Sequence, residues 1–135
     1  MKKNNFFFLI LSIVILFASC TQDCTEIKFA DGISTLNGKL YTGDCESRYI
    51  NNQVKSIQHY ADGKDEGAWI FYYLDGKVQT KAFFKAGIRV GKWEYFHENG
   101  QLWKTQTYDA LGNKIGVWET FDEDGKMITS ETISY

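Results

Sequence analysis

The sequence predicts an all-β protein: an elongated, single-layer antiparallel sheet of about four repeated β-hairpins, with a repeat of 24–25 residues, preceded by a signal peptide. Three observations support this prediction. Aromatic residues are abundant (10 Phe, 8 Tyr and 4 Trp), proline is absent, and glycine and tryptophan recur at a fixed spacing. Aromatic side chains favour strands, whereas proline interrupts the hydrogen bonds between strands. The mature chain shows no amphipathic helical stretch that could cover such a sheet.

The chain begins with a segment typical of a targeting signal. Lys2 and Lys3 precede an apolar run from Phe6 to Ala18. As a helix this run would be only ~20 Å long at ~1.5 Å per residue, which is too short for a hydrocarbon core of ~30 Å. A signal peptide therefore fits better than a transmembrane anchor. The run ends in the sequence FASC, whose cysteine is Cys20. This ending resembles the lipobox of bacterial lipoproteins, in which the signal is cut before the cysteine and the thiol is acylated.

The lipobox resemblance implies a lipid anchor on Cys20 and a place in the cell envelope of a bacterium. The expected membrane is the outer membrane, with the protein on its periplasmic or surface face. Two or more acyl chains anchor a protein stably, since each buried methylene contributes roughly 0.8 kcal/mol. The alternative is an ordinary secretory signal cleaved near Ala18 or Ser19, which would leave Cys20 free. The expected organisation is a signal peptide over residues 1–19, a tether over 20–32 and a repeat domain over 33–135.

Charge and cysteine content narrow the remaining possibilities. The 15 basic and 17 acidic residues form no basic excess, so no nucleic-acid partner is expected. In an oxidising compartment Cys24 and Cys45 would be the two remaining thiols, which makes a disulfide between them a hypothesis. In the alternative both stay reduced, with Cys45 as a small packing residue and Cys24 in the tether.

An internal repeat is the strongest feature of the sequence. Its repeat-defining residues are three tryptophans, the glycine two positions before each and the glycine seven positions after each: Gly67, Trp69 and Gly76; Gly91, Trp93 and Gly100; Gly116, Trp118 and Gly125. Twenty-four residues before Gly67 lies Gly43, followed by Cys45 at the tryptophan position. We therefore expect a degenerate first unit, as is common for terminal repeats.

The sequence of each unit predicts one hairpin. Asp75-Gly76, and the matching Asn99-Gly100 and Asp124-Gly125, can adopt positive φ at both centres of a two-residue type I′ turn. Such a turn would pair Trp69 with Ala82, Phe71 with Thr80 and Tyr73 with Val78. In the later units it would pair His97 with Leu102, Phe96 with Trp103, and Phe121 with Ile128.

Strand alternation then assigns the side chains to two faces. The more apolar face carries the tryptophans together with Phe71, Tyr73 and Tyr95, whereas Phe96 and Trp103 fall on the other. Phe71, Tyr73 and Tyr95 are the candidate binding face, because a contiguous exposed apolar patch usually marks an interaction site and tyrosine is favoured there. The alternative is that this stripe forms the packing of the sheet itself.

The segments GAWIFYYLDGKV, beginning at Gly67, and GKWEYFHENGQL, beginning at Gly91, resemble MORN repeats, and more closely the bacterial MORN-variant repeats. The resemblance covers roughly Ile33 to Met127 and implies an elongated, twisted sheet of successive hairpins. It implies no catalytic residues. The family is associated with membranes, lipid headgroups and protein partners, and some members are antitoxin components.

No pattern in the sequence indicates catalysis or metal binding. The two histidines, His59 and His97, lie far apart, and no zinc-ligand spacing is present. Acidic residues beside glycines, as in Asp62 to Gly67, are better explained as turns than as a calcium loop. We therefore expect no enzyme, no cofactor, no metal and no small-molecule substrate. The expected function is a lipid-anchored interaction or scaffold module with a protein partner, and the alternative is an antitoxin or immunity-like protein that neutralises a toxin.

Overall fold

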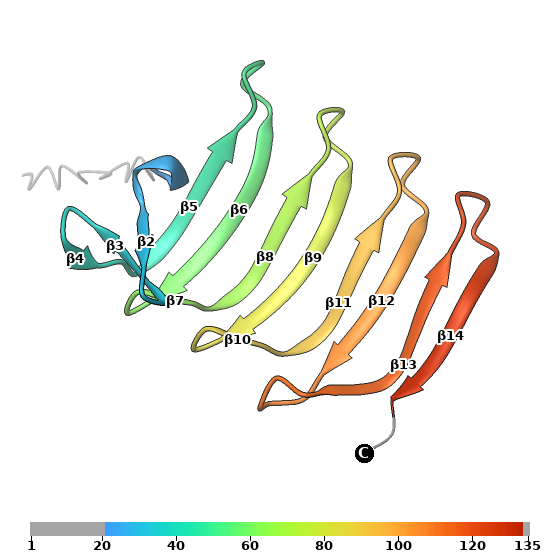
Figure 1. Cartoon of the computed structure of the whole chain (residues 1–135). Coiled ribbons are helices and arrows are strands. Elements are labelled where there is room, and N and C mark those ends of the chain that lie inside the picture. The colour runs from blue at the N-terminus through green and yellow to red at the C-terminus, as the bar shows by residue number, and fades with distance from the viewer. Residues whose placement is uncertain (1–20, 134–135) are drawn as a thin grey trace, which may run out of the picture.

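The computed structural model describes residues 21–133 (Figure 1); Cys20 and the predicted signal peptide lie outside the described residues. Within this range the only helical element is the short 3-10 helix η1 (Cys24–Glu26), and the predicted all-β sheet of hairpins is confirmed. No helix among the described residues has the length and apolar character that a membrane crossing requires. The strands are β1 (Gln22–Asp23), β2 (Lys28–Ala30), β3 (Ile33–Leu36), β4 (Lys39–Leu40), β5 (Gly43–Arg48), β6 (Val54–Ala61), β7 (Lys64–Asp65), β8 (Gly67–Tyr72), β9 (Val78–Lys85), β10 (Ile88–Arg89), β11 (Gly91–Phe96), β12 (Leu102–Tyr108), β13 (Lys114–Phe121) and β14 (Met127–Ile133).

The main sheet consists of successive hairpins lying side by side in one layer (Figure 1). Its order is β1-β5-β6-β8-β9-β11-β12-β13-β14, with β7 and β10 paired to β6 and β9. Among the strands of residues 21–133, only β1 and β5 pair in parallel. Two of the junctions between neighbouring hairpins have short ladders: β6 pairs with β8 through Ser56–Phe71 and Ile57–Ile70, and β9 pairs with β11 through two pairs as well. The third junction, between β12 and β13, has four pairs. Side chains must therefore hold the rest of each junction.

The type I′ turn predicted at Asp75-Gly76 and at the two matching loops is wrong. Tyr73 N–H donates to Lys77 O (2.8 Å) and Gly76 N–H donates to Tyr73 O (3.0 Å), so the loop contains three residues. Only Gly76 has positive φ (+85°), as in a type I turn followed by a left-handed glycine. Two-residue turns with positive φ at both centres occur at the opposite ends of the hairpins, at Asp62-Gly63 and Ala86-Gly87.

The longer loop changes the pairing near it. Trp69–Ala82 and Phe71–Thr80 pair as predicted. The other predicted pairs are wrong: Val78 pairs with Tyr72, Leu102 with Phe96 and Met127 with Phe121, while Trp103 and Ile128 have no partner in the ladders of their own hairpins. In all four hairpins the returning strand holds one extra residue beside the loop, and these residues are Lys55, Gln79, Trp103 and Ile128.

The extra residue has its largest consequence at Trp103. A bulge redirects side chains locally, and the Trp103 ring lies 6.1 Å from that of Tyr95 and 6.0 Å from that of His97 between ring centroids. Trp103 therefore lies with Tyr95, and its predicted assignment to the opposite face is wrong.

A second, three-stranded sheet of β2, β3 and β4 packs at the N-terminal end of the array (Figure 1). The repeat pattern does not predict it. Ser34 N–H donates to Gly63 O (2.7 Å), and Gly63 N–H donates to Tyr41 O (2.8 Å), which ties this small sheet to the Asp62-Gly63 turn. Most of the predicted tether is thus part of structured elements, namely β1, η1 and β2.

Candidate interaction surface

A continuous row of aromatic rings crosses all four hairpins, and we call it the aromatic ladder. Successive rings lie 4.8–5.7 Å apart between centroids. Its members are Tyr41, Tyr60, Trp69, Phe84, Trp93, Tyr108 and Trp118. Tilted and edge-to-face contacts of this kind stabilise packed rings. The ladder serves as the core of a sheet over which residues 21–133 place no full second layer, and for this reason Trp69, Phe84 and Trp118 stay partly exposed.

The repeated tryptophans also connect each hairpin to the one before it. The indole N–H of Trp69 donates to His59 O (2.9 Å), that of Trp93 to Phe83 O (3.1 Å), and that of Trp118 to Thr107 O (3.3 Å). A buried indole needs such an acceptor. Each tryptophan therefore combines apolar packing with a hydrogen bond across a junction that has few backbone pairs.

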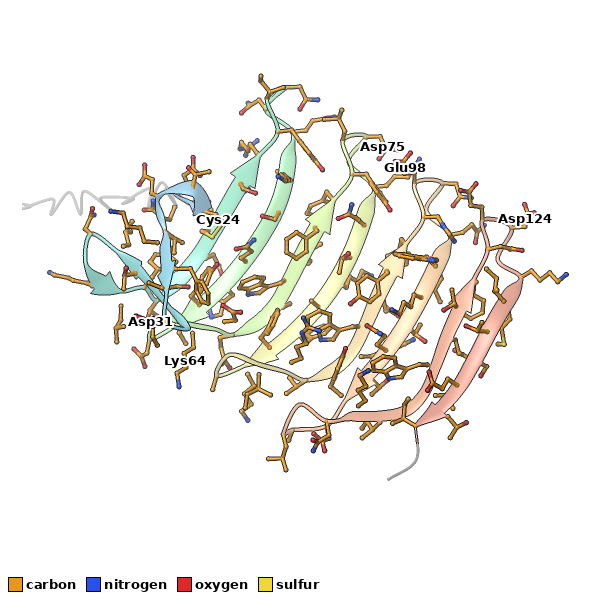
Figure 2. All side chains as sticks on the ribbon, viewed as in Figure 1. Cys24, Asp31, Lys64, Asp75, Glu98 and Asp124 are labelled. Carbon is orange, nitrogen blue, oxygen red and sulfur yellow. A yellow bond between two sulfur atoms is a disulfide. The ribbon has the colours of Figure 1, made fainter. Side chains whose placement is uncertain are left out.

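A second set of hydrogen bonds joins the hairpins at their loop ends, on the edge where Asp75, Glu98 and Asp124 lie (Figure 2). Tyr49 OH donates to Tyr72 O (2.7 Å) and Tyr73 OH donates to Phe96 O (2.6 Å). His97 Nε2 lies 2.9 Å from Phe121 O at the same repeat position. Sequence reasoning missed these bonds. The recurrence of a ring with a polar tip every 24 residues was the signal that could have revealed them.

The candidate binding face lies within this packing. The Phe71 ring is 6.3 Å from the Trp69 ring, Tyr73 bonds to Phe96 O, and Tyr95 OH donates to Gln106 Oε1 (3.2 Å). Burial raises the pKa of both the Tyr73 and the Tyr95 hydroxyl above the ordinary value. All three side chains are half-buried. The hydroxyl groups of Tyr73 and Tyr95 form hydrogen bonds within the array, Phe71 packs through its ring alone, and part of each ring remains open to solvent.

The glycines that define the repeat have the backbone conformation their positions require. Those before the tryptophans have φ of +64° (Gly67), +68° (Gly91) and +70° (Gly116). Those in the loops have φ of +85° (Gly76), +90° (Gly100) and +79° (Gly125). Residues with a side chain rarely adopt this left-handed backbone conformation. Glycine therefore recurs wherever a hairpin of the array requires it.

A disulfide joins Cys24 to Cys45, with their Cα atoms 5.0 Å apart. Cys45 is fully buried and packs with Tyr41 and Tyr60, and Cys24 packs against the same group. Cys45 occupies the repeat position of the tryptophans. The disulfide therefore fills, in the degenerate first hairpin, the space that an indole fills in the others.

A cavity of about 280 Å³ opens beside this disulfide. It lies where the N-terminal segment carrying Cys24 crosses the beginning of the array (Figure 2). Its lining combines apolar and polar side chains: Cys24, Ile27, Phe29, Ser34, Gln58, Tyr60, Asp65 and Trp69. Tyr60 OH donates to Gln58 Oε1 (2.8 Å). Burial, with a smaller contribution from the negative charge of Asp65, raises the pKa of Tyr60 to about 12. Sequence reasoning did not identify this cavity.

Asp65 is the one lining residue that carries a charge. Burial raises the pKa of its carboxyl group above the ordinary value. Within residues 21–133 its carboxylate takes part in none of the ion pairs, which join Arg48 with Glu46, Lys77 with Asp75 and Lys92 with Glu94, and it lies outside the hydrogen bond between His59 and Asp44. The cavity thus offers aromatic walls and a hydrogen-bond acceptor of negative charge. Nowhere in the described part of the chain do three metal-ligating side chains gather.

A family model described as MORN repeat variant matches residues 65–86, 89–110 and 114–132. These three matches span half of the chain, from residue 65 to residue 132, and each begins four residues before a tryptophan of the ladder. The degenerate hairpin β5–β6 lies before the first match. No curated protein and no solved structure matches the chain at a significant level.

Proposed function

Because the chain belongs to the MORN repeat variant family, we propose that it is a lipid-anchored protein-interaction module of the bacterial cell envelope. The repeats suggest a protein-interaction module, and those of this family are generally non-enzymatic. The observation that carries the proposal is the single-layer sheet: within the described residues, no second layer covers its faces beyond the N-terminal end, where the segment carrying Cys24 and the small sheet pack. Among its large apolar side chains, Phe83 and Trp103 are 42% and 44% exposed. Exposed apolar groups of this kind favour docking of a partner.

The lipid anchor is supported by the lipobox-like FASC ending at Cys20. Thr21 follows directly, and β1 begins at Gln22 and pairs with β5. Little free chain would therefore separate an acyl group on Cys20 from the first hairpin. An anchor at this position would hold the N-terminal end of the array next to the membrane.

Metabolic labelling with a clickable fatty acid tests the anchor. Cys20→Ser should abolish the label and release the protein from the membrane fraction. The matched control is Cys24→Ser, which changes a cysteine four residues away and should leave both label and fractionation unchanged. Unchanged labelling of Cys20→Ser would contradict the proposal.

Crosslinking in intact cells followed by affinity capture tests the interaction surface. Trp103→Ser should lose a specific partner while circular dichroism shows an unchanged sheet. Ile50→Ser is the control, because Ile50 is a fully exposed apolar residue in the loop of the first hairpin. Equal capture by both variants would show that the Trp103 region is not the docking surface.

The alternative, neutralisation of a toxin, is supported only by the family resemblance. It predicts that the captured partner arrests growth when produced alone and that co-production of this chain restores growth. A partner that has no effect on growth would favour the scaffold role instead.

A further inference from the structure

The three tryptophans of the ladder differ in what lies over their rings. The Arg89 guanidinium lies 4.9 Å from the centroid of Trp93, and the Lys114 ammonium lies 4.6 Å from the centroid of Trp118. Each cation comes from the residue four positions before its tryptophan. A cation over an indole face is attracted by the electrons of the ring. In two of the three units, therefore, a cation of the same chain lies over the tryptophan ring.

The unit of Trp69 has a carboxylate at the same position. The residue four before Trp69 is Asp65, and the described part of the chain places no lysine or arginine over the Trp69 ring. Asp65 belongs to β7, which pairs with β6 just as β10, the strand that carries Arg89, pairs with β9. The backbone setting is thus shared, and the charge is reversed.

The space beside Trp69 is a cavity rather than a filled contact. Trp69, Tyr60 and Phe29 contribute aromatic walls, and Asp65 contributes the charge. The carboxylate of Asp65 has no ion-pair or hydrogen-bond partner within residues 21–133, and only burial affects its pKa. A half-buried carboxylate without a counter-ion is stabilised by any cation that reaches it.

We propose that this cavity receives a lysine or arginine side chain of a protein partner, which lies over the Trp69 ring with Asp65 as its counter-ion. The inference rests on the proposed interaction function and specifies one contact in it. The chemistry of the partner follows from charge complementarity and from the two sister sites, where one guanidinium and one ammonium occupy the corresponding place. The cavity volume of about 280 Å³ suits one side chain and is smaller than typical pockets for drug-sized ligands.

The proposal is tested by titrating peptides into the full chain in detergent micelles and monitoring the NMR signals of the indole N–H groups. The probes are the capped peptide Gly-Gly-Lys-Gly-Gly and the same peptide with norleucine, which keeps the alkyl chain and lacks the charge. The signal of Trp69, assigned with Trp69→Phe, should shift saturably with the lysine peptide and not with the norleucine peptide. Equal shifts with both peptides, or none with either, would overturn the proposal.

Two substitutions at Asp65 separate a built site from general attraction. Asp65→Asn should weaken binding of the lysine peptide by roughly fivefold or more, since it removes the counter-ion. Asp65→Lys should supply an internal cation, as Lys114 does over Trp118. It should abolish peptide binding and, without any peptide, move the Trp69 indole signal in the direction that the peptide moves it in the wild type. An unmoved indole signal in a folded Asp65→Lys variant would contradict the proposed geometry.

Two further measurements assign the source of the cation. Phosphoethanolamine, the amine group of a common lipid headgroup, should shift the Trp69 signal less than the lysine peptide at equal concentration, and an equal or larger shift would overturn the protein assignment. In the cellular crosslinking experiment, a partner captured equally by the wild type and by Asp65→Lys would overturn this site and leave the interaction module intact. Loss of all partners by Trp103→Ser, with peptide binding unchanged, would show that the two contacts are independent.

Discussion

The first and last hairpins of the array follow the same repeat but have different surroundings. Hairpin β5–β6 has β1 on its outer edge, the small sheet bonded to the Asp62-Gly63 turn that follows β6, and the Cys24–Cys45 disulfide joined to β5. In hairpin β13–β14, every residue of β14 from Met127 to Thr132 is exposed, and no strand of the described range pairs with the outer edge of β14. The hairpin with the poorer match to the repeat is therefore the one with more packing. In an array of this kind the neighbours, rather than the repeat sequence alone, determine how firmly a unit is held.

Replacing a tryptophan inside the array should have the largest effect. Trp93 is 6% exposed and packs between Phe84 and Tyr108. Trp93→Ala should lower the free energy of unfolding by ~3–5 kcal/mol, and Trp118→Ala should lower it less, because Trp118 is partly exposed and contacts Tyr108 on one side only among the described rings. Urea denaturation measures both. The opposite order would show that the last hairpin is not the weaker end.

Reduction of the disulfide, which lies at the first hairpin, should have the second largest effect on the free energy of unfolding. Closing a loop with a sequence separation of 21 stabilises a fold by roughly 3 kcal/mol through the entropy of the unfolded chain. We expect reductant or Cys24→Ser to lower the unfolding free energy by about that amount, whereas Cys20→Ser should leave it unchanged. Alkylation followed by intact-mass measurement on unreduced protein gives the state of the bond directly, and alkylation at both Cys24 and Cys45 would show that the bond is absent.

Two glycines test whether the small sheet packs against the array. Gly63 and Gly87 occupy matching turns with φ of +76° and +84°, so alanine at either position is strained by ~1–2 kcal/mol. A Cβ at Gly63 would also lie 2.9 Å from Ser34 O, whereas one at Gly87 would contact nothing within 4 Å. Gly63→Ala should therefore be more destabilising than Gly87→Ala by another ~1–3 kcal/mol in thermal or urea melts. Equal losses would indicate that the small sheet is not packed there.

The smallest expected effect is a gain in stability. Ala86 has φ of +51° at the turn position where the neighbouring unit has Asp62, with φ of +48°. Asparagine tolerates this conformation better than alanine, and the bond from the residue 86 N–H to Glu66 Oε2 (2.7 Å) would be kept. Ala86→Asn should raise the unfolding free energy by roughly 0.5–1 kcal/mol. A loss of stability would show that this turn is not strained.

The repeat, the hairpins and the single layer could be predicted because each follows from a spacing of residues that only one architecture explains. The turn type could not. Asp75-Gly76 suits both a type I′ turn and a type I turn with a left-handed glycine, and the two differ only in which backbone groups bond. The three-residue loop is also the reason that Trp103 lies on the face of Tyr95, because it leaves Trp103 as the extra residue of its strand.

The contacts at the N-terminal end were beyond the reach of the repeat pattern for a different reason. The small sheet and the cavity depend on residues 22–40, which carry no repeat and meet the array only in three dimensions. The disulfide was open as a hypothesis because pairing depends on the distance between two backbones. The inter-hairpin bonds of Tyr49, Tyr73 and His97 join residues 23–24 positions apart, and their backbone acceptors leave no mark in the sequence.

Native-state hydrogen exchange tests most directly the claim that the array is held at its N-terminal end and opens from β14. The account predicts that amides paired within β5–β6 exchange only near global unfolding, whereas those paired between β13 and β14 exchange through local opening at a clearly lower free energy. Reduction of Cys24–Cys45 should narrow the difference by lowering the protection of β5–β6. Equal protection at the two ends, or greater protection of β14 than of β5–β6 in unreduced protein, would contradict the account.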